Sequence, residues 1–338
     1  MNYISIGDIA QSFQLRRHNV QLRRHLQQLS EELTSGVKAD LAEAVSGDFK
    51  VLAGIDRSLQ NLAPYHTATT EAAQITASLQ ESFAVIQDMA TQLAPGLLGV
   101  ATSSDPALVD TLASDARQKF RAAVSTLNTQ VGDRYLLSGA ATDQKPLAGS
   151  QDILDALSLA VAGQVTASGV QAAVAAWFDA PAGGGGYLDT VYGGSASTLA
   201  PFALGEGDSA LLDVTAADAP VRDMLEGLAL GALLAEGVLS GFPAERTALA
   251  TSAGESLFAA NGQMAALRAR IGTVEAHIDT AATRNAAEKS ALEVARAGIV
   301  AADPYDTASA LEAVQTQLET LYSLTARLSR LSLADFLR

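Results

Sequence analysis

The chain has 338 residues and a net charge of −15, from 37 acidic and 22 basic side chains. A chain of this length suggests about two domains. It contains no cysteine, which excludes disulfides, thiolate metal sites and cysteine nucleophiles. Nucleic-acid affinity comes mainly from Lys and Arg, so we expect no nucleic-acid partner for such an acidic chain. Apolar residues make up 48% of the chain but aromatic residues only 5%, which favours helices packed on helices.

No stretch of the sequence predicts a membrane span. The nearest, residues 224–242, is interrupted by Glu226 and Glu236, whereas a spanning helix needs about 20 mainly apolar residues. Near the N-terminus, Asp8 and a pair of arginines interrupt any apolar run. We therefore expect no membrane insertion and no cleavable secretory signal.

The first helical segment is expected within residues 1–45, which we interpret as an N-terminal assembly helix. Residues 5–8 (SIGD) indicate its start, because a hydroxyl stands three residues before a carboxylate. Leucines then recur at intervals of three, four or seven residues and predict an apolar seam: Leu15, Leu22, Leu26, Leu29 and Leu33. The helix is expected to end at Ser35 and Gly36, since glycine suits the left-handed position after a helix.

Residues 46–140 are predicted to form the first half of a helical body. Apolar residues recur every three or four positions from 72 to 93, and we expect this helix to end at Pro95 and Gly96. Asp105 and Pro106 indicate the N-cap and first residue of the next helix.

Residues 244–303 are predicted to form the second half of this body, with an apolar register from Leu267 to Ile299. Asp303 and Pro304 then start a C-terminal assembly helix over residues 304–338. Its apolar seam consists of Leu311, Val314, Leu318, Leu321 and Leu328. Spacing of three and four residues sustained over many turns is typical of a coiled coil.

Residues 141–243 differ in composition and are expected to form a variable acidic insert domain. Between positions 140 and 226, 11 acidic and two basic residues give a charge of −9. We interpret residues 183–186, four glycines, as a flexible linker. The remainder predicts helices over 153–178 and 221–239 and short strands over 187–192 and 211–214.

Together these segments predict a mainly α fold. It would be an antiparallel long-helix or coiled-coil body, with a small α/β insert between the two helical halves. Each leading helix would pack against a trailing one.

The sequence offers no catalytic, cofactor-binding or metal site, so we expect neither an enzyme nor a cofactor. His18 and His25 are seven residues apart, whereas two histidines that share a zinc ion on one helix stand four apart. No glycine-rich phosphate loop that ends in Lys and Ser or Thr is present.

Two features of the terminal helices leave alternatives open. Leu15-Arg16-Arg17-His18 recurs one heptad later as Leu22-Arg23-Arg24-His25. The four arginines are either a solvated coiled-coil flank or an inter-subunit charge stripe that pairs with acidic residues of neighbouring copies. The leucine seams either fold back into one bundle or pack against copies of the chain, since long apolar stripes mark interaction surfaces.

Three segments resemble a known family. Residues 28–36 (QLSEELTSG) are similar to the "RLSSG" region of the bacterial flagellin superfamily. Residues 128–139 (NTQVGDRYLLSG) and 142–143, with residues 303–306 (DPYD) and the ending 331–337 (LSLADFL), most resemble the members of that superfamily that join hook and filament. The resemblance covers residues 1–140 and 244–338. Residues 37–47 depart from the family pattern.

The resemblance implies a structural, self-assembling component of the bacterial flagellum at the junction between hook and filament. Flagellin, the bulk filament subunit, is the alternative. The implied partners are copies of the chain, the neighbouring hook-associated protein, flagellin and an export chaperone. It also implies type III export without a cleaved signal and an extracellular location, with terminal helices that become ordered on assembly.

Overall fold

The computed structural model describes residues 6–102 and 106–336, apart from the side chains of 6–9, 11 and 329–336. The described chain is mainly α-helical, as expected. It forms two compact units, one of Met1–Ala63 with Ala287–Arg338 and one of Pro64–Ala286. The five-segment division expected from the sequence stays a prediction.

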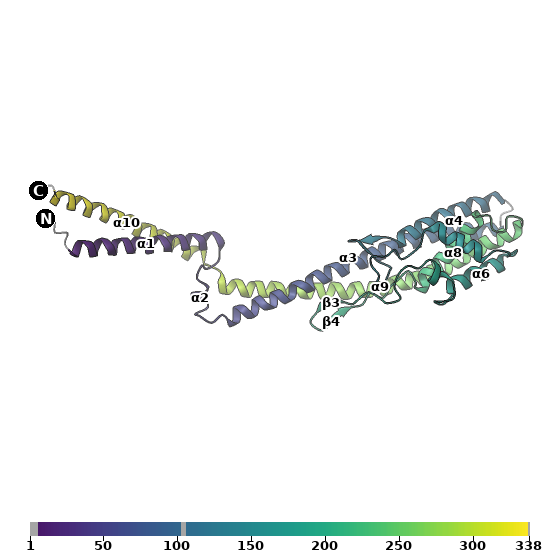
Figure 1. Cartoon of the computed structure of the whole chain (residues 1–338), viewed down its shortest axis with the longest axis horizontal. Coiled ribbons are helices and arrows are strands. Elements are labelled where there is room, and N and C mark those ends of the chain that lie inside the picture. The colour runs from purple at the N-terminus through teal and green to yellow at the C-terminus, as the bar shows by residue number, and fades with distance from the viewer. Residues whose placement is uncertain (1–5, 103–105, 337–338) are drawn as a thin grey trace. The chain divides into compact units, whose positions relative to one another are not determined.

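The first unit is built around the two terminal helices. It contains α1 (Ile6–Ser35), α2 (Leu41–Ala44), the start of α3 (Lys50–Gly99), the end of α9 (Pro243–Val300) and α10 (Pro304–Phe336). Helices α1 and α10 lie side by side and run in opposite directions, since the start of α1 lies beside the end of α10 (Figure 1).

Short backbone contacts hold the ends of α1 and α9 together within this unit. Gly36, at φ +70°, ends α1 as expected. Its carbonyl accepts a hydrogen bond from the amide of Ala302 at 3.0 Å, and the amide of Lys38 donates to the carbonyl of Val300 at 2.8 Å. The Asp303 carboxylate caps α10 by accepting from the amide of Tyr305 at 2.8 Å. The expected helix start at Asp303 and Pro304 is confirmed, whereas residue 5 of the expected α1 start lies outside the described residues.

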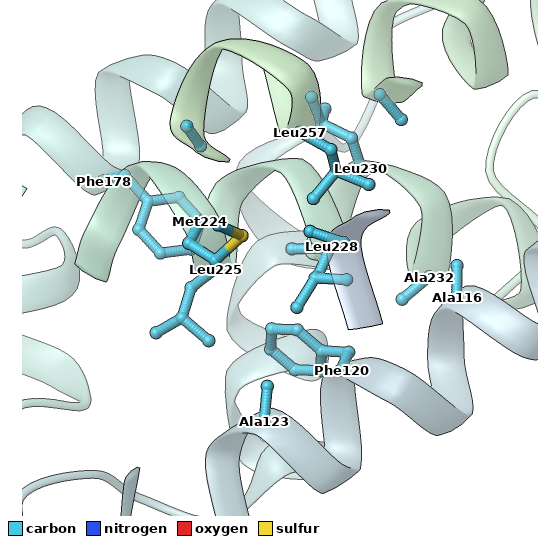
Figure 2. Packing of buried hydrophobic residues seen from close by; sticks show 14 of the residues in the cluster. Ala116, Phe120, Ala123, Phe178, Met224, Leu225, Leu228, Leu230, Ala232 and Leu257 are labelled. Atoms are coloured by element: carbon cyan, nitrogen blue, oxygen red, sulfur yellow. The ribbon is translucent and has the colours of Figure 1, made fainter. Parts of the chain in front are cut away.

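The second unit packs α4 (Pro106–Leu127) and α8 (Ala219–Ala235) against α3 and α9. Gln80 of α3 donates to the carbonyl of Arg268 at 2.8 Å, and Gln87 to that of Asn261 at 3.3 Å, so α3 and α9 are antiparallel. In the core, Phe120 of α4 lies against Leu228 of α8 (Figure 2).

Helix α3 corrects the expected stop at Pro95 and Gly96. It runs to Gly99 with Pro64 and Pro95 in its interior, and a 3-10 turn, Val100–Thr102, follows it. A proline inside a helix removes one backbone hydrogen bond. Leu93 and Leu97 on either side of Pro95 are buried at 1% and 0% exposure, so packing outweighs that loss.

The middle of the chain contains α5 (Ser150–Ala160), α6 (Ala167–Asp179), α7 (Tyr187–Thr190) and two hairpins, β1 (Gln130–Val131) with β2 (Arg134–Tyr135) and β3 (Phe202–Gly205) with β4 (Asp208–Ala210). Residues from α5, α6 and α8 share one hydrophobic core with α3, α4 and α9.

Three expectations for this middle region were wrong. The helix expected over 153–178 is two helices, because Gly163, at φ +83°, breaks it and the Thr166 hydroxyl caps α6. Residues 187–190 are helical, whereas a strand was expected there. Residues 211–214 do not form the expected strand, because the hairpin pairs residues 202–205 with 208–210.

The glycine run is also not a flexible linker. The amides of Gly183 and Gly185 donate to the carboxylate of Asp189 at 2.8 and 2.7 Å, which closes the run into a loop at the start of α7. These bonds hold the pKa of Asp189 below its usual value. Tyr187 then buries its ring and donates its hydroxyl to the carbonyl of Ala216 at 2.8 Å.

Candidate assembly interface

The structure brings most of the predicted seam residues together between α1 and α10. Leu22, Leu29, Val314, Leu318 and Leu321 form one buried cluster, and Leu15, Leu26 and Leu311 pack partly buried against it. Leu33 and Leu328 lie at the ends of the seam with 41% and 37% exposure. The two leucine stripes are thus covered mainly by each other.

This arrangement follows from helix geometry. Leucines spaced alternately by three and four residues stay on one face, because an α-helix turns once per 3.6 residues. Fully burying a leucine side chain gains about 1.5–3 kcal/mol. Burial of two such stripes in one chain therefore favours an antiparallel pair. In the described chain the two stripes pair with each other, and packing of these helices against copies of the chain stays a prediction.

Apolar side chains on the opposite face of α1 remain uncovered. Phe13 and Val20 are 66% and 49% exposed. They stand seven residues apart, and Val20 lies about 160° around the helix from the buried Leu22. The leucine pattern did not reveal this second face, although an apolar pair at heptad spacing outside the seam is a signal that the sequence contains.

The four arginines of the predicted charge stripe divide into two groups. The guanidinium of Arg23 donates to the hydroxyl of Tyr322 on α10, at 2.9 Å from Nη2 and 3.3 Å from Nε. Arg16, Arg17 and Arg24 are exposed, and among the described side chains no carboxylate forms an ion pair with them. By helix geometry, Arg17 and Arg24 share the outward face with Phe13 and Val20.

The outward side of α10 carries the opposite charge. Glu312 and Glu319 are both exposed, and each lies about 140–160° around the helix from the buried Val314. Thr316 stands between them, is exposed, and donates its hydroxyl to the carbonyl of Glu312 at 3.0 Å. The pair of terminal helices thus has an apolar interior, a basic outward face on α1 and an acidic outward face on α10.

Ionisable side chains in the second unit form contacts that hold its elements together. The carboxylate of Asp208 accepts from Arg284 Nη2 at 2.8 Å and lies 3.0 Å from His277 Nε2, which fastens the β3–β4 hairpin to α9. The Arg284 hydrogen bond, with His277, holds the pKa of Asp208 below its usual value. Within residues 6–102 and 106–336, no group of three or more His, Asp or Glu side chains is placed to hold a metal ion.

The segment at residues 128–139, one of those that resemble the family, is held by buried contacts. Leu137 and Ser138 are buried, and the Ser138 hydroxyl donates to the carbonyl of Gln144 at 2.6 Å. Gly139 has φ +60°, and a Cβ there would lie 2.4 Å from the carbonyl oxygen of Ser197. A side chain at position 139 would therefore clash with the backbone of Ser197. It would also strain the backbone of residue 139 itself, whose φ is positive.

Comparisons with known proteins agree with this architecture. Residues 256–337 match the family model described as the bacterial flagellin C-terminal helical region. This match includes most of α9 and the described part of α10. No curated protein sequence matches the chain.

Solved structures also match the chain, among them one from Bacillus cereus and one from Vibrio parahaemolyticus. The crystal structure of FlgL from Bacillus cereus has a TM-score of 0.52 and 12% identity over 72% of this chain and 100% of that chain. A putative flagellar hook-associated protein from Vibrio parahaemolyticus has a TM-score of 0.49 and 12% identity over 73% of this chain and 95% of that chain. The C-terminal match confirms the expected resemblance to the flagellin superfamily, and the fold is similar to that of FlgL.

The sequence predicted no membrane-spanning helix. None of the described helices is long and apolar enough to cross a membrane.

Proposed function

We propose that this chain, which carries a flagellin C-terminal helical region, is a structural component of the bacterial flagellum that self-assembles at the junction between hook and filament. One observation carries this proposal: the flagellin match includes α10, the helix that closes the leucine seam with α1. The FlgL-like fold over 72% of the chain supports the junction rather than another part of the flagellum.

In this function the terminal helices are the assembly elements. The seam of Leu15, Leu22, Leu26, Leu29, Leu33, Leu311, Val314, Leu318, Leu321 and Leu328 would hold α1 on α10. The outward faces would then meet neighbouring subunits. Ordering each residue costs about 1–2 kcal/mol of backbone entropy, which offsets much of the gain from leucine burial. Contacts with neighbours would therefore strengthen a helix pair that is close to balance by itself.

The partners that follow are copies of the chain, the neighbouring hook-associated protein, flagellin and an export chaperone. The chain would act outside the cell after type III export without a cleaved signal. It would be non-enzymatic, because its chemistry is burial and charge pairing at subunit contacts.

The second candidate is flagellin, the bulk filament subunit. The family match favours it, since the matched model describes the C-terminal region of flagellin itself. The two candidates differ in copy number, because a filament subunit occurs along the whole filament and a junction protein only at its base.

Antibody labelling of isolated flagella along their length separates the candidates. We expect label only where hook meets filament. Label along the entire filament would indicate the bulk subunit, and flagella without any label would overturn the proposal.

A truncation tests the role of α10. Deletion of residues 303–338 removes half of the seam but leaves the described part of the second unit intact. We expect a helical protein that no longer joins flagella. Flagella of wild-type number and composition made with the truncated chain would show that α10 is dispensable.

A further inference from the structure

The two outward faces of the terminal helix pair are complementary in charge. On α1, Arg17 and Arg24 are exposed and lie on the side away from the seam. On α10, Glu312 and Glu319 are exposed and likewise lie on the side away from the seam. Basic and acidic faces thus occur on opposite sides of one two-helix layer.

The described side chains leave these charges without an ion-pair partner in the same chain. Among the described side chains, no ion pair joins α1 to α10, and Tyr322 of α10 forms hydrogen bonds with Arg23 and Asn19 of α1. Arg17 and Glu319 point away from each other, because the leucine seam occupies the side on which α1 and α10 meet. A contact between the two faces requires a second chain.

The spacing of the charges also matches. Arg17 and Arg24 are seven residues apart, as are Glu312 and Glu319. At a rise of 1.5 Å per residue, each pair spans about 10.5 Å along its helix. Two helices packed side by side can therefore form both ion pairs at once, in either direction.

Apolar and small side chains lie between these charges. Phe13 and Val20 flank Arg17 on α1, and Thr316 separates the two glutamates of α10. A large apolar side chain opposite a small residue allows close helix packing. Contact would remove Phe13 and Val20 from water while the charged groups form its rim, as at other protein interfaces.

We propose that the outward face of α1 in one copy of this chain binds the outward face of α10 in the next copy. This inference rests on the proposed function and specifies the subunit contact that performs it. The two faces differ, so the contact is heterologous and repeats from copy to copy. Such a contact generates a ring where the rotation closes and a helical tube where it does not.

Charge exchange in the purified full-length chain tests this contact. The variant R17E/R24E makes both faces acidic, and E312R/E319R makes both faces basic. Opposed like charges disfavour the contact strongly. We expect each variant alone to raise the concentration needed for self-association about tenfold or more at low salt, measured by sedimentation.

The combined variant R17E/R24E/E312R/E319R restores opposite charges and should assemble at close to the wild-type concentration. An equal mixture of the two double variants should also assemble, because an acidic α1 face then meets a basic α10 face. The control D279R/E288R replaces two exposed acids outside α1 and α10 and changes the net charge as E312R/E319R does. It should assemble as wild type does.

Circular dichroism and thermal unfolding of every variant show whether each is folded. A combined variant that is folded but assembles no better than the worse double variant would overturn the inference, as would self-association of both double variants at the wild-type concentration. Antibody labelling of flagella reports on the proposed function separately. If labelling places the chain at the junction but the combined variant fails to assemble, the proposed function stands and this subunit contact is overturned.

Discussion

The hydroxyl of Tyr322 accepts hydrogen bonds from Arg23 across the pair of terminal helices, at 2.9 Å from Nη2 and 3.3 Å from Nε. Leucines at regular spacing pack almost equally well after one helix slides by a heptad. A polar contact at one level favours one of these registers, because the sliding of one helix would break it. The exposed contact of Arg23 with Tyr322 therefore favours the observed register of α1 against α10.

The hydrogen bonds from Arg23 predict how the pKa of Tyr322 changes when Arg23 is replaced. The Arg23 hydrogen bond is the main factor that lowers the pKa of Tyr322, because it favours the phenolate. In the Arg23→Gln variant we expect the titration of Tyr322 to move to higher pH. The measurement is the ultraviolet absorbance difference between each protein and the same protein with Tyr322→Phe. Coincident difference curves in the two backgrounds would show that Arg23 does not act on the phenol.

The seam predicts a local loss of stability in the first unit. Leu318 is 8% exposed, and replacing a buried leucine by alanine costs about 2–5 kcal/mol. We expect Leu318→Ala to speed hydrogen exchange of the α1 amides while exchange in α8 stays unchanged. Val20→Ala is the control, since Val20 is 49% exposed and its truncation should change stability by less than about 0.5 kcal/mol. Equal exchange rates in Leu318→Ala and wild type would contradict the role of the seam.

The leucine spacing predicted most of the buried contact between α1 and α10 because burial on a helix depends on periodicity. Leu22 and Leu318 lie where the heptads place them, and Asp303 caps α10 as its sequence indicates. The exposed partners Phe13 and Val20 were not predicted, since two apolar residues outside the main stripe have no periodic signal of comparable length.

Local signals failed where contacts distant in sequence decide the structure. Pro95 predicts a helix end, yet the core packing of its neighbours keeps α3 helical at this position. The four glycines read as a linker, yet the Asp189 carboxylate folds them into a loop. In both places a tertiary or side-chain contact overrides local propensity, and no spacing rule in one sequence reveals it.

The basic face predicts a salt dependence of assembly. Screening weakens attraction between exposed charges as ionic strength rises. We expect R16Q/R17Q/R24Q, which keeps Arg23 and its contact with Tyr322, to weaken self-association more at low salt than at high salt. Sedimentation over a salt series measures this difference. An equal loss at every salt concentration would mean that these arginines contribute packing or folding rather than charge.

The close packing of α4 and α8 predicts that alanine will have opposite effects on the melting temperature at two glycine positions. A Cβ at Gly231 would lie 2.7 Å from the Cβ of Ala116, whereas a Cβ at Gly262 of α9 meets nothing within 4 Å. Alanine stabilises a helix interior by about 0.5–1 kcal/mol relative to glycine. We therefore expect Gly262→Ala to raise the melting temperature, and Gly231→Ala to lower it because two helices must separate, at a cost of about 1–3 kcal/mol. A higher melting temperature in both variants would show that α4 and α8 accommodate the methyl group.

Glu226 predicts how the stability of the second unit depends on pH. Partial burial, with Asp223 and Asp179 nearby, raises the pKa of Glu226 to about 7, which Arg222 only partly opposes. Arg222 donates to the carbonyl of Phe178 and lies 3.4 Å from Asp179, and among the described side chains no ion pair joins it to Glu226. The folded chain thus binds this proton more tightly than the unfolded chain does. Its contribution to stability is complete below the ordinary glutamate pKa and is lost as pH rises towards about 7.

Glu226→Gln should remove this dependence. A neutral amide does not ionise, so we expect the variant to gain about 1 kcal/mol over wild type above pH 7, a modest figure because water still reaches the half-buried carboxylate. Below the ordinary glutamate pKa the two proteins should unfold alike. Denaturant unfolding followed by circular dichroism across this range gives the difference. The matched variant Glu255→Gln replaces an exposed acid of α9 and should follow wild type at every pH. A constant difference between Glu226→Gln and wild type would assign the effect to shape or hydrogen bonding rather than to ionisation of the carboxyl.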